Sequence, residues 1–171
     1  MNTKLLHTAG GLAATLALLA AGPAGAASLS DDPARDTITG TPGNDDLVGT
    51  HGPDIIRALA GDDSVRGLGG ADRIRGATGA DVLYGFRGAD YISAGPGADV
   101  IYGGQGPDTY LAGGPGHDTV NAGPGNDKIG MRPHDGRDVI YCGTGHDTVY
   151  YLGAVDPDDV RHACEVVFIE D

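Results

Sequence analysis

Aspartate recurs at a nearly fixed interval over most of this chain. Twelve aspartates share one phase, spaced by nine residues from Asp45 to Asp108 and then by ten, nine, eleven and nine. Each has a glycine two positions before it and a large apolar residue two positions after it. Carboxylate oxygens are hard ligands for divalent cations, so the pattern predicts a repeated cation site. The aspartates are Asp45, Asp54, Asp63, Asp72, Asp81, Asp90, Asp99, Asp108, Asp118, Asp127, Asp138 and Asp147.

The repeating unit excludes a helix. Its cleanest copy, residues 95–103, reads Gly-Pro-Gly-Ala-Asp-Val-Ile-Tyr-Gly. Each glycine in a helix interior costs about 1 kcal/mol relative to alanine. The apolar residue also returns every nine positions, whereas a helix face needs about 3.6. The unit therefore predicts a tight turn followed by a very short strand.

At these residues the sequence resembles the calcium-binding nonapeptides of the repeats-in-toxin (RTX) family, whose pattern is Gly-Gly-x-Gly-x-Asp-x-apolar-x. The resemblance covers about residues 40–151. It implies an all-β fold, a right-handed parallel β-roll (a β-solenoid), in which two nonapeptide units complete one coil. Each unit would then contribute a calcium-binding turn and a short strand, with Ca²⁺ as the bound ion.

The expected calcium ligands are carboxylates and backbone carbonyls together. A glycine turn exposes carbonyl oxygens beside the carboxylates, and calcium accepts roughly six to eight oxygens in flexible geometry, whereas magnesium demands a strict octahedron. We expect the best sites where the pattern is cleanest, in residues 95–127. Besides the twelve aspartates, the expected ligands there are Gly95, Gly97, Gly104, Gly106, Gly114 and Gly116.

Stacked carboxylates repel one another unless a cation lies between them. In a coil of two units, Asp81 would lie one coil from Asp99, at the sheet spacing of about 4.8 Å. Two such charges repel by roughly 0.8 kcal/mol in water and by about 3 kcal/mol at an effective dielectric constant of about 20. The sequence thus predicts a chain that is disordered without calcium and folds when calcium is added. The alternative is that each aspartate only makes an Asx turn with its own backbone.

Stacked coils also supply a core for a glycine-rich chain. The sequence has 31 glycines, two phenylalanines and no tryptophan, so its core depends on one apolar side chain per unit. A solenoid places these side chains above one another. We expect one sheet to bury Leu47, Val65, Leu83 and Ile101, and the other to bury Ile56, Ile74, Ile92 and Tyr110.

Some units depart from the family pattern. Leu59, Leu68 and Phe86 replace the second glycine, and a side chain there opposes the positive φ that a glycine turn allows. Calcium binding in those turns is therefore less well supported. Residues 133–135 interrupt the pattern before Asp138 with a two-residue insertion, which predicts a loop or bulge.

Residues 1–26 have the features of a secretory signal peptide. Lys4 supplies a basic start, residues 12–21 an apolar core and residues 24–26 a small-residue cleavage site. The segment is too short and too glycine-rich for a spanning helix, although a retained lipid-facing anchor is the alternative. We expect a secreted, extracellular protein with no membrane span and a linker at residues 27–39. Removing Lys4 changes the formal charge from -13 to -14, which argues against nucleic acid as a partner.

The period fails beyond Tyr151. Residues 152–171 have their own apolar run, and we expect them to cap the open end of the roll formed by residues 40–151. Cys142 and Cys164 are the only cysteines. In an exported chain two cysteines most simply form one disulfide, with two free thiols or a metal pair as the other options.

Outward positions of the roll form ladders of side chains. One sheet would carry Tyr84 and Tyr102, which we interpret as packing surface. The other would carry Arg57, Arg73 and Arg75. These arginines either bind an acidic glycan, or keep an edge of the roll soluble and offset the negative charge of nearby carboxylates.

No catalytic motif accompanies the repeats. The chain has no His-Glu-x-x-His and no Gly-x-Ser-x-Gly, and we interpret His117 and His146 as turn residues. We therefore expect no enzyme but a calcium-binding protein with a structural, adhesive or matrix role, whose partner would be an extracellular glycan or the cell-surface matrix. The alternative is an enzyme or accessory module acting on extracellular polysaccharide, because such repeats often accompany these enzymes in the family.

Overall fold

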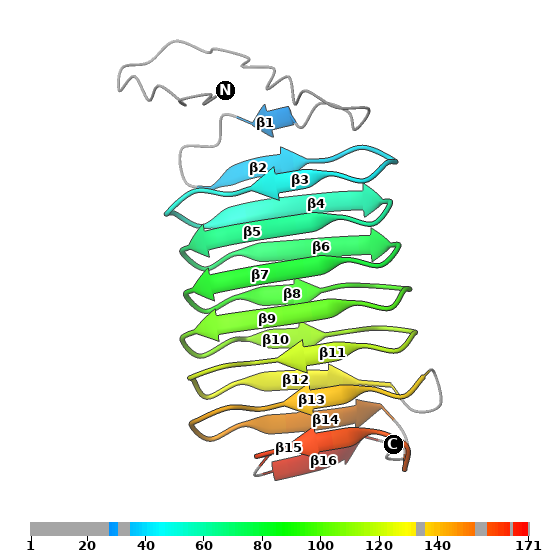
Figure 1. The fold of residues 1–171 in the computed structure, drawn as a ribbon. Coiled ribbons are helices and arrows are strands. Elements are labelled where there is room, and N and C mark those ends of the chain that lie inside the picture. The colour runs from blue at the N-terminus through cyan, green and yellow to red at the C-terminus, as the bar shows by residue number, and fades with distance from the viewer. Residues whose placement is uncertain (1–27, 31–34, 133–135, 153–156, 165, 171) are drawn as a thin grey trace.

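The described part of the chain consists of strands and turns (Figure 1). The computed structural model describes residues 28–30, 35–132, 136–152, 157–164 and 166–170, and no helix occurs in them. The predicted signal peptide and the insertion at residues 133–135 lie outside the described residues. Within the described ranges, no helix is long and apolar enough to cross a membrane.

Sixteen strands form two sheets. The nine-stranded sheet contains β1 (Ser28–Ser30), β2 (Asp36–Thr39), β4 (Asp54–Ala60), β6 (Arg73–Thr78), β8 (Tyr91–Ser93), β10 (Tyr110–Ala112), β12 (Lys128–Met131), β14 (Thr148–Leu152) and β16 (Val166–Glu170). The seven-stranded sheet contains β3 (Asp46–Val48), β5 (Ser64–Gly69), β7 (Val82–Arg87), β9 (Val100–Gln105), β11 (Thr119–Asn121), β13 (Val139–Tyr141) and β15 (Val160–His162).

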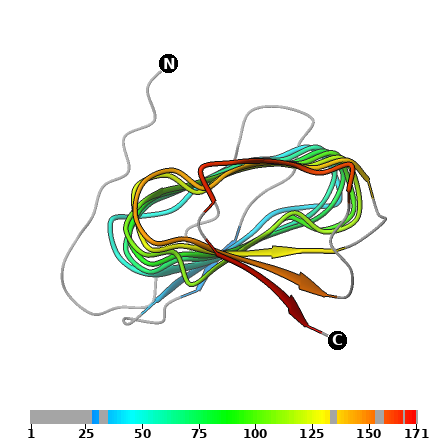
Figure 2. The ribbon, with the colours of Figure 1, turned by 90° about the horizontal axis from the view of Figure 1, so that it is seen from below.

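From β2 onward, successive strands alternate between the two sheets, and each strand pairs with the next strand of its own sheet in parallel. Only β1 pairs antiparallel, with β2. The register joins Leu47 to Val65 and Ile56 to Ile74, so one coil contains two nonapeptide units. Viewed along the stack, the coils lie nearly on top of one another around a flattened ring (Figure 2). This confirms the predicted β-solenoid architecture.

The core is one apolar ladder from each sheet. The seven-stranded sheet buries Leu47, Val65, Leu83, Ile101, Val120 and Ile140. The nine-stranded sheet buries Ile38, Ile56, Ile74, Ile92, Leu111, Ile129 and Val149. Side chains alternate in and out along each strand because the strand period is two residues, so each unit turns one large apolar side chain inward. Smaller contributions to the buried core come from Ala58, Ala94 and Ala122, and at the C-terminal end from Met131, Cys142 and Tyr151.

The prediction of Tyr110 as a core residue was wrong. Leu111 pairs with Ile92 and is fully buried, whereas Tyr110 pairs with Tyr91 and is only partly buried. A β-bulge is the cause: the N–H groups of Thr109 and Tyr110 both donate to the carbonyl of Asp90, at 2.8 and 3.4 Å. This additional residue explains why the aspartate spacing lengthens to ten at Asp118.

Both sheets continue beyond the last repeat. Strand β15 extends the seven-stranded sheet and β16 the nine-stranded sheet, each in parallel. A disulfide joins Cys142 to Cys164, with the two Cα atoms 5.2 Å apart. Cys142 is fully buried, at the position within its turn that Ala58, Ala94 and Ala122 occupy in other coils.

We expect the disulfide to stabilise this end of the roll. Replacing both Cys142 and Cys164 with alanine should lower the free energy of unfolding by about 3 kcal/mol, the chain-entropy value for closing a loop of this length. Alanine is the matched choice at 142, because Ala122 fills the same place one coil earlier. Urea denaturation in saturating calcium measures the effect, and an unchanged midpoint would show that the bond adds nothing.

Candidate metal centre

The repeat aspartates lie in two columns, one at each turn of the coil. From Asp45 to Asp138, the backbone N–H of each aspartate donates to Oδ1 of the aspartate one coil later, at 2.8–3.0 Å. The long column contains Asp45, Asp63, Asp81, Asp99, Asp118, Asp138 and Asp159. The short column contains Asp54, Asp72, Asp90, Asp108, Asp127 and Asp147. All twelve predicted aspartates are therefore brought together.

Sequence reasoning missed Asp159, the last member of the long column. Its Oδ1 accepts the N–H of Asp138 at 2.9 Å, and Val160 after it pairs with Val139. Its turn lacks the glycine two positions before, where Pro157 stands. The available signal was its spacing: Asp159 follows Asp138 by 21 residues, close to the preceding step of 20.

The second carboxylate oxygen distinguishes the middle turns. In seven of the repeat aspartates, Oδ2 is buried and has no hydrogen-bond partner in the described structure. Each of these side chains is at most 2% exposed. Burying an ionised oxygen without a partner is strongly unfavourable, so the arrangement requires a cation or a proton. The seven are Asp63, Asp72, Asp81, Asp90, Asp99, Asp108 and Asp127.

The glycine two positions before each aspartate lets the coils approach one another. At Gly88, φ is +142°, and a β-carbon would overlap the carbonyl oxygen of Gly70 in the preceding coil. The same overlap recurs at Gly79 with Gly61 and at Gly106 with Gly88. A side chain at this position would force the coils apart, which explains why the repeats from Asp63 onward keep the Gly-x-Asp sequence.

In the described turns after the first two, the residue four positions before the aspartate adopts positive φ even at Leu59, Leu68, Ala77 and Phe86, which are not glycine. These four residues have φ between +73° and +90°, a region that costs about 1–2 kcal/mol for a residue with a side chain. The doubt raised by the sequence at Leu59, Leu68 and Phe86 concerned whether their side chains allow this conformation, and all three residues adopt it. Asp63, Asp72 and Asp90, in the same turns, belong to the set with a buried, unpartnered Oδ2.

The predicted glycine ligands lie in the same turns. Gly95, Gly104 and Gly114 stand four positions before Asp99, Asp108 and Asp118, and Gly97, Gly106 and Gly116 stand two positions before them. All except Gly97 have φ between +110° and +148°. Their carbonyl oxygens therefore belong to the turn that holds each carboxylate, and they are candidates for the remaining ligands.

In some repeats the side chain directly before the aspartate also hydrogen-bonds to the next coil. Asn44 Oδ1 accepts the N–H of Asp62, and Asn126 Oδ1 accepts the N–H of His146, both at 2.9 Å. His117 Nδ1 accepts the N–H of Arg137 at 2.8 Å. Both histidines thus take part in hydrogen bonds between coils, which agrees with their interpretation as turn residues.

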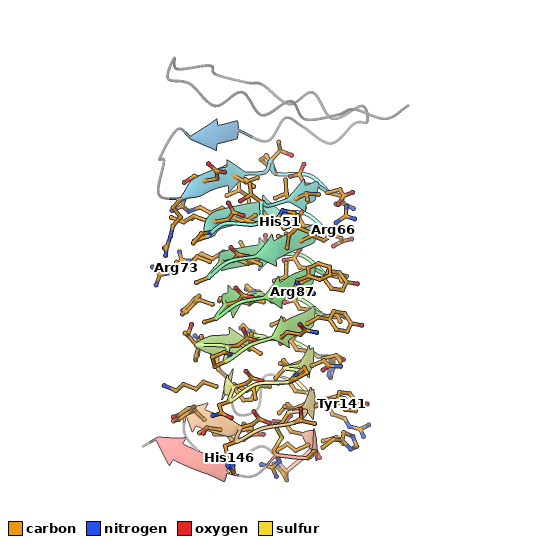
Figure 3. The ribbon with its side chains drawn as sticks, turned by 90° about the vertical axis from the view of Figure 1, so that its left-hand side faces the viewer. His51, Arg66, Arg73, Arg87, Tyr141 and His146 are labelled. Atoms are coloured by element: carbon orange, nitrogen blue, oxygen red, sulfur yellow. A yellow bond between two sulfur atoms is a disulfide. The ribbon has the colours of Figure 1, made fainter. Side chains whose placement is uncertain are left out.

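The outward-facing ladders contain stacked aromatic rings and an arginine that lies over a tyrosine ring. Tyr84 and Tyr102 stack with ring centroids 4.8 Å apart, and the Arg73 guanidinium lies 5.2 Å from the ring centroid of Tyr91. Figure 3 shows Arg73 pointing away from one sheet, and Arg66 and Tyr141 away from the other. These contacts join neighbouring coils along the roll.

Burial raises the pKa of several carboxyls in the middle of the columns. It raises the pKa of Asp63, Asp99 and Asp127 to about 6, and that of Asp72 and Asp108 to about 7, from an ordinary 3.8. The N–H group of the preceding coil opposes this shift because it favours the ionised form, and the neighbouring carboxylates of the column add to it.

Raised pKa values predict the pH dependence of the metal-free protein. Between about pH 4 and pH 7 the folded chain binds more protons than the unfolded chain, so its stability falls as pH rises through this window. In excess EDTA we expect more strand-type circular dichroism at pH 5.5 than at pH 8. Equal or greater order at pH 8 would contradict the assigned burial of these carboxyls.

The donor chemistry fits a hard cation. Within the described ranges no group of three His, Cys, Asp or Glu side chains is arranged to hold a metal ion by side chains alone. Each middle turn contributes one buried carboxylate, so a cation there would take its other ligands from backbone carbonyls. An oxygen-only set of carboxylate and carbonyl ligands in a flexible turn suits calcium.

Comparison with known families agrees with this geometry. The family model of the RTX calcium-binding nonapeptide repeat (4 copies) matches residues 25–56, 39–74, 48–83, 66–100, 75–110, 96–129 and 134–153. The chain belongs to this RTX family. Its repeats bind Ca²⁺, and the matched residues contain all twelve of the predicted aspartates. A comparison with curated proteins gave no match.

Proposed function

We propose that this RTX chain is a secreted structural protein whose roll folds when calcium binds and then serves an adhesive or matrix role. The observation that carries the proposal is the set of seven buried aspartate oxygens without a hydrogen-bond partner. Buried charges are tolerated when they are paired or bound to a metal. The folded roll is therefore stable at neutral pH only together with a cation.

The proposed ligands are Oδ2 of the middle aspartates and the carbonyl oxygens of the glycine turns. Gly95 and Gly97 would serve the turn of Asp99, and Gly104 and Gly106 the turn of Asp108. Calcium supplies the positive charge that offsets the carboxylates of a column. The chain supplies a turn that places one carboxylate per coil at a fixed spacing.

The surface supports a structural role. Outward side chains form repeated contacts between coils, such as the Tyr91–Tyr110 stack and the Arg66–Asp46 ion pair at 2.7 Å. The disulfide between Cys142 and Cys164 suits an oxidising, extracellular environment. The alternative, an enzyme or accessory module acting on extracellular polysaccharide, has no comparable support among the described residues.

Calcium stoichiometry tests the proposal. Asp90→Asn keeps a carbonyl oxygen for the N–H of Asp72 but replaces the buried, unpartnered oxygen with a neutral amide. We expect equilibrium dialysis to show at least one bound calcium fewer than in the natural chain. Asp46→Asn is the matched control, because it removes the same charge from an exposed side chain and should leave the calcium count unchanged. A natural chain that binds no calcium would overturn the proposal.

A further inference from the structure

We propose that the first turn of each column and the last turn of the long column are closed by the chain's own hydrogen bonds and bind no calcium, so that the calcium sites lie in the turns between them. This inference rests on the proposed function. It assigns a role to Thr41, Thr50 and Tyr151, whose polar groups occupy aspartate oxygens at the positions where calcium would bind in the middle of the roll.

The first turn of each column is closed by a threonine. The N–H of Thr41 donates to Oδ2 of Asp45, and the N–H of Thr50 donates to Oδ2 of Asp54, both at 2.6 Å. The Thr50 hydroxyl lies 3.2 Å from the same Asp54 oxygen and accepts the N–H of Gly52 at 3.1 Å. The carboxylate oxygen that lacks a partner in the middle turns is therefore fully engaged here.

Backbone conformation separates these turns from the middle ones. Thr41 and Thr50 occupy the position four residues before the aspartate, and neither has a positive φ. At the same position Ala77, Gly95 and Gly104 have positive φ, and their N–H groups donate to carbonyls of the next coil, at 2.7–2.9 Å. In the middle turns this amide is thus unavailable to the carboxylate of its own turn.

The other end of the long column is closed by a tyrosine. The Tyr151 hydroxyl donates to Oδ2 of Asp159 at 3.1 Å, and Tyr151 is fully buried. The Arg161 guanidinium lies 5.6 Å from the centroid of the Tyr151 ring and adds positive charge beside this last carboxylate. The thirteenth aspartate therefore has a protein donor at the oxygen that is left bare in the middle turns.

The position of the first turns in the stack explains why they differ from the middle turns. Among the described residues, the first repeat turn of each column has a repeat turn on one side only, and donors of its own turn already contact its carboxylate. A hydrogen bond within the turn satisfies the carboxylate there without a second coil. End units of repeat proteins commonly differ in this way, because they have to close an otherwise incomplete stack.

The test compares equivalent substitutions at the end and in the middle. Asp54→Asn keeps a carbonyl oxygen for the Thr50 N–H, so the variant should fold and bind as many calcium ions as the natural chain in equilibrium dialysis. Asp90→Asn should bind at least one fewer. If Asp54→Asn loses as many calcium ions as Asp90→Asn, the inference is wrong although the proposed function stands. If the natural chain binds no calcium, the proposed function itself has failed.

A second variant tests the threonine directly. Thr50→Gly removes the hydroxyl and allows the positive φ seen at Gly95 and Gly104, so we expect it to bind one additional calcium ion. Thr50→Ser keeps the hydroxyl and is the control, with an unchanged count. Equal counts for Thr50→Gly, Thr50→Ser and the natural chain would contradict the role assigned to Thr50.

Discussion

Excess EDTA at pH 8 is expected to unfold the roll. Seven aspartate oxygens are buried without a hydrogen-bond partner, and leaving one such group unsatisfied costs about 1–3 kcal/mol, with charged groups at the upper end. Together they cost on the order of 10 kcal/mol, which is comparable to the roughly 5–15 kcal/mol that stabilises an ordinary domain. The core consists mainly of one apolar ladder per sheet, and its burial is too small to offset this loss of stability.

Circular dichroism and limited proteolysis measure the expected change. The strand signal and protease resistance should disappear on chelation and return when calcium is added in excess over EDTA. Magnesium added in place of calcium is the control, and we expect little recovery because its octahedral geometry suits a carbonyl-lined turn poorly. A compact, protease-resistant chain in EDTA at pH 8 would show that the columns are stable without metal.

The fold was predictable from the sequence because the spacing of the aspartates, the glycines and the apolar residues all indicated the same repeating unit. One apolar residue per unit predicted the ladder of Leu47, Val65, Leu83 and Ile101, and the register confirms it. The error at Tyr110 arose because Tyr110 and Leu111 are adjacent and both apolar. A bulge changes which of the two points inward, and only the hydrogen bonds to Asp90 reveal it.

The columns were predictable, but the differences among their turns were not. Gly-x-Asp marks a turn whose glycine meets the preceding coil, so its spacing identifies the twelve aspartates. Phe86 is 41% exposed and holds φ at +73°. Its left-handed conformation is held by pairing with Leu68 and Gly104 on either side. This is a tertiary effect, which the backbone preference of phenylalanine alone does not predict. Asp159 was missed because its turn has Pro157 in place of the glycine.

Replacing Gly88 with alanine should destabilise the calcium-bound roll by about 3 kcal/mol or more. The new β-carbon would overlap the carbonyl of Gly70, which is backbone and is held in place by its own coil. Overpacking costs about 1–3 kcal/mol or more, and the positive φ at Gly88 adds about 1–2 kcal/mol for a residue with a side chain. Because the overlap lies between two coils, it should also push the turns of Asp72 and Asp90 apart.

Gly43 supplies a matched control because it occupies the same place in the first repeat turn, where no described backbone atom lies against it. A β-carbon at Gly43 meets only the Thr41 hydroxyl at 4.0 Å, and its φ is not positive. Both substitutions reduce the entropy of the unfolded chain equally, a gain of about 0.4–1 kcal/mol, so their difference isolates the packing between coils. In saturating calcium, Gly88→Ala should lower the urea midpoint strongly, while Gly43→Ala should leave it equal or slightly raised. Equal losses in the two variants would mean that glycine is required by the turn itself, and that the close approach of successive coils does not account for the repeat.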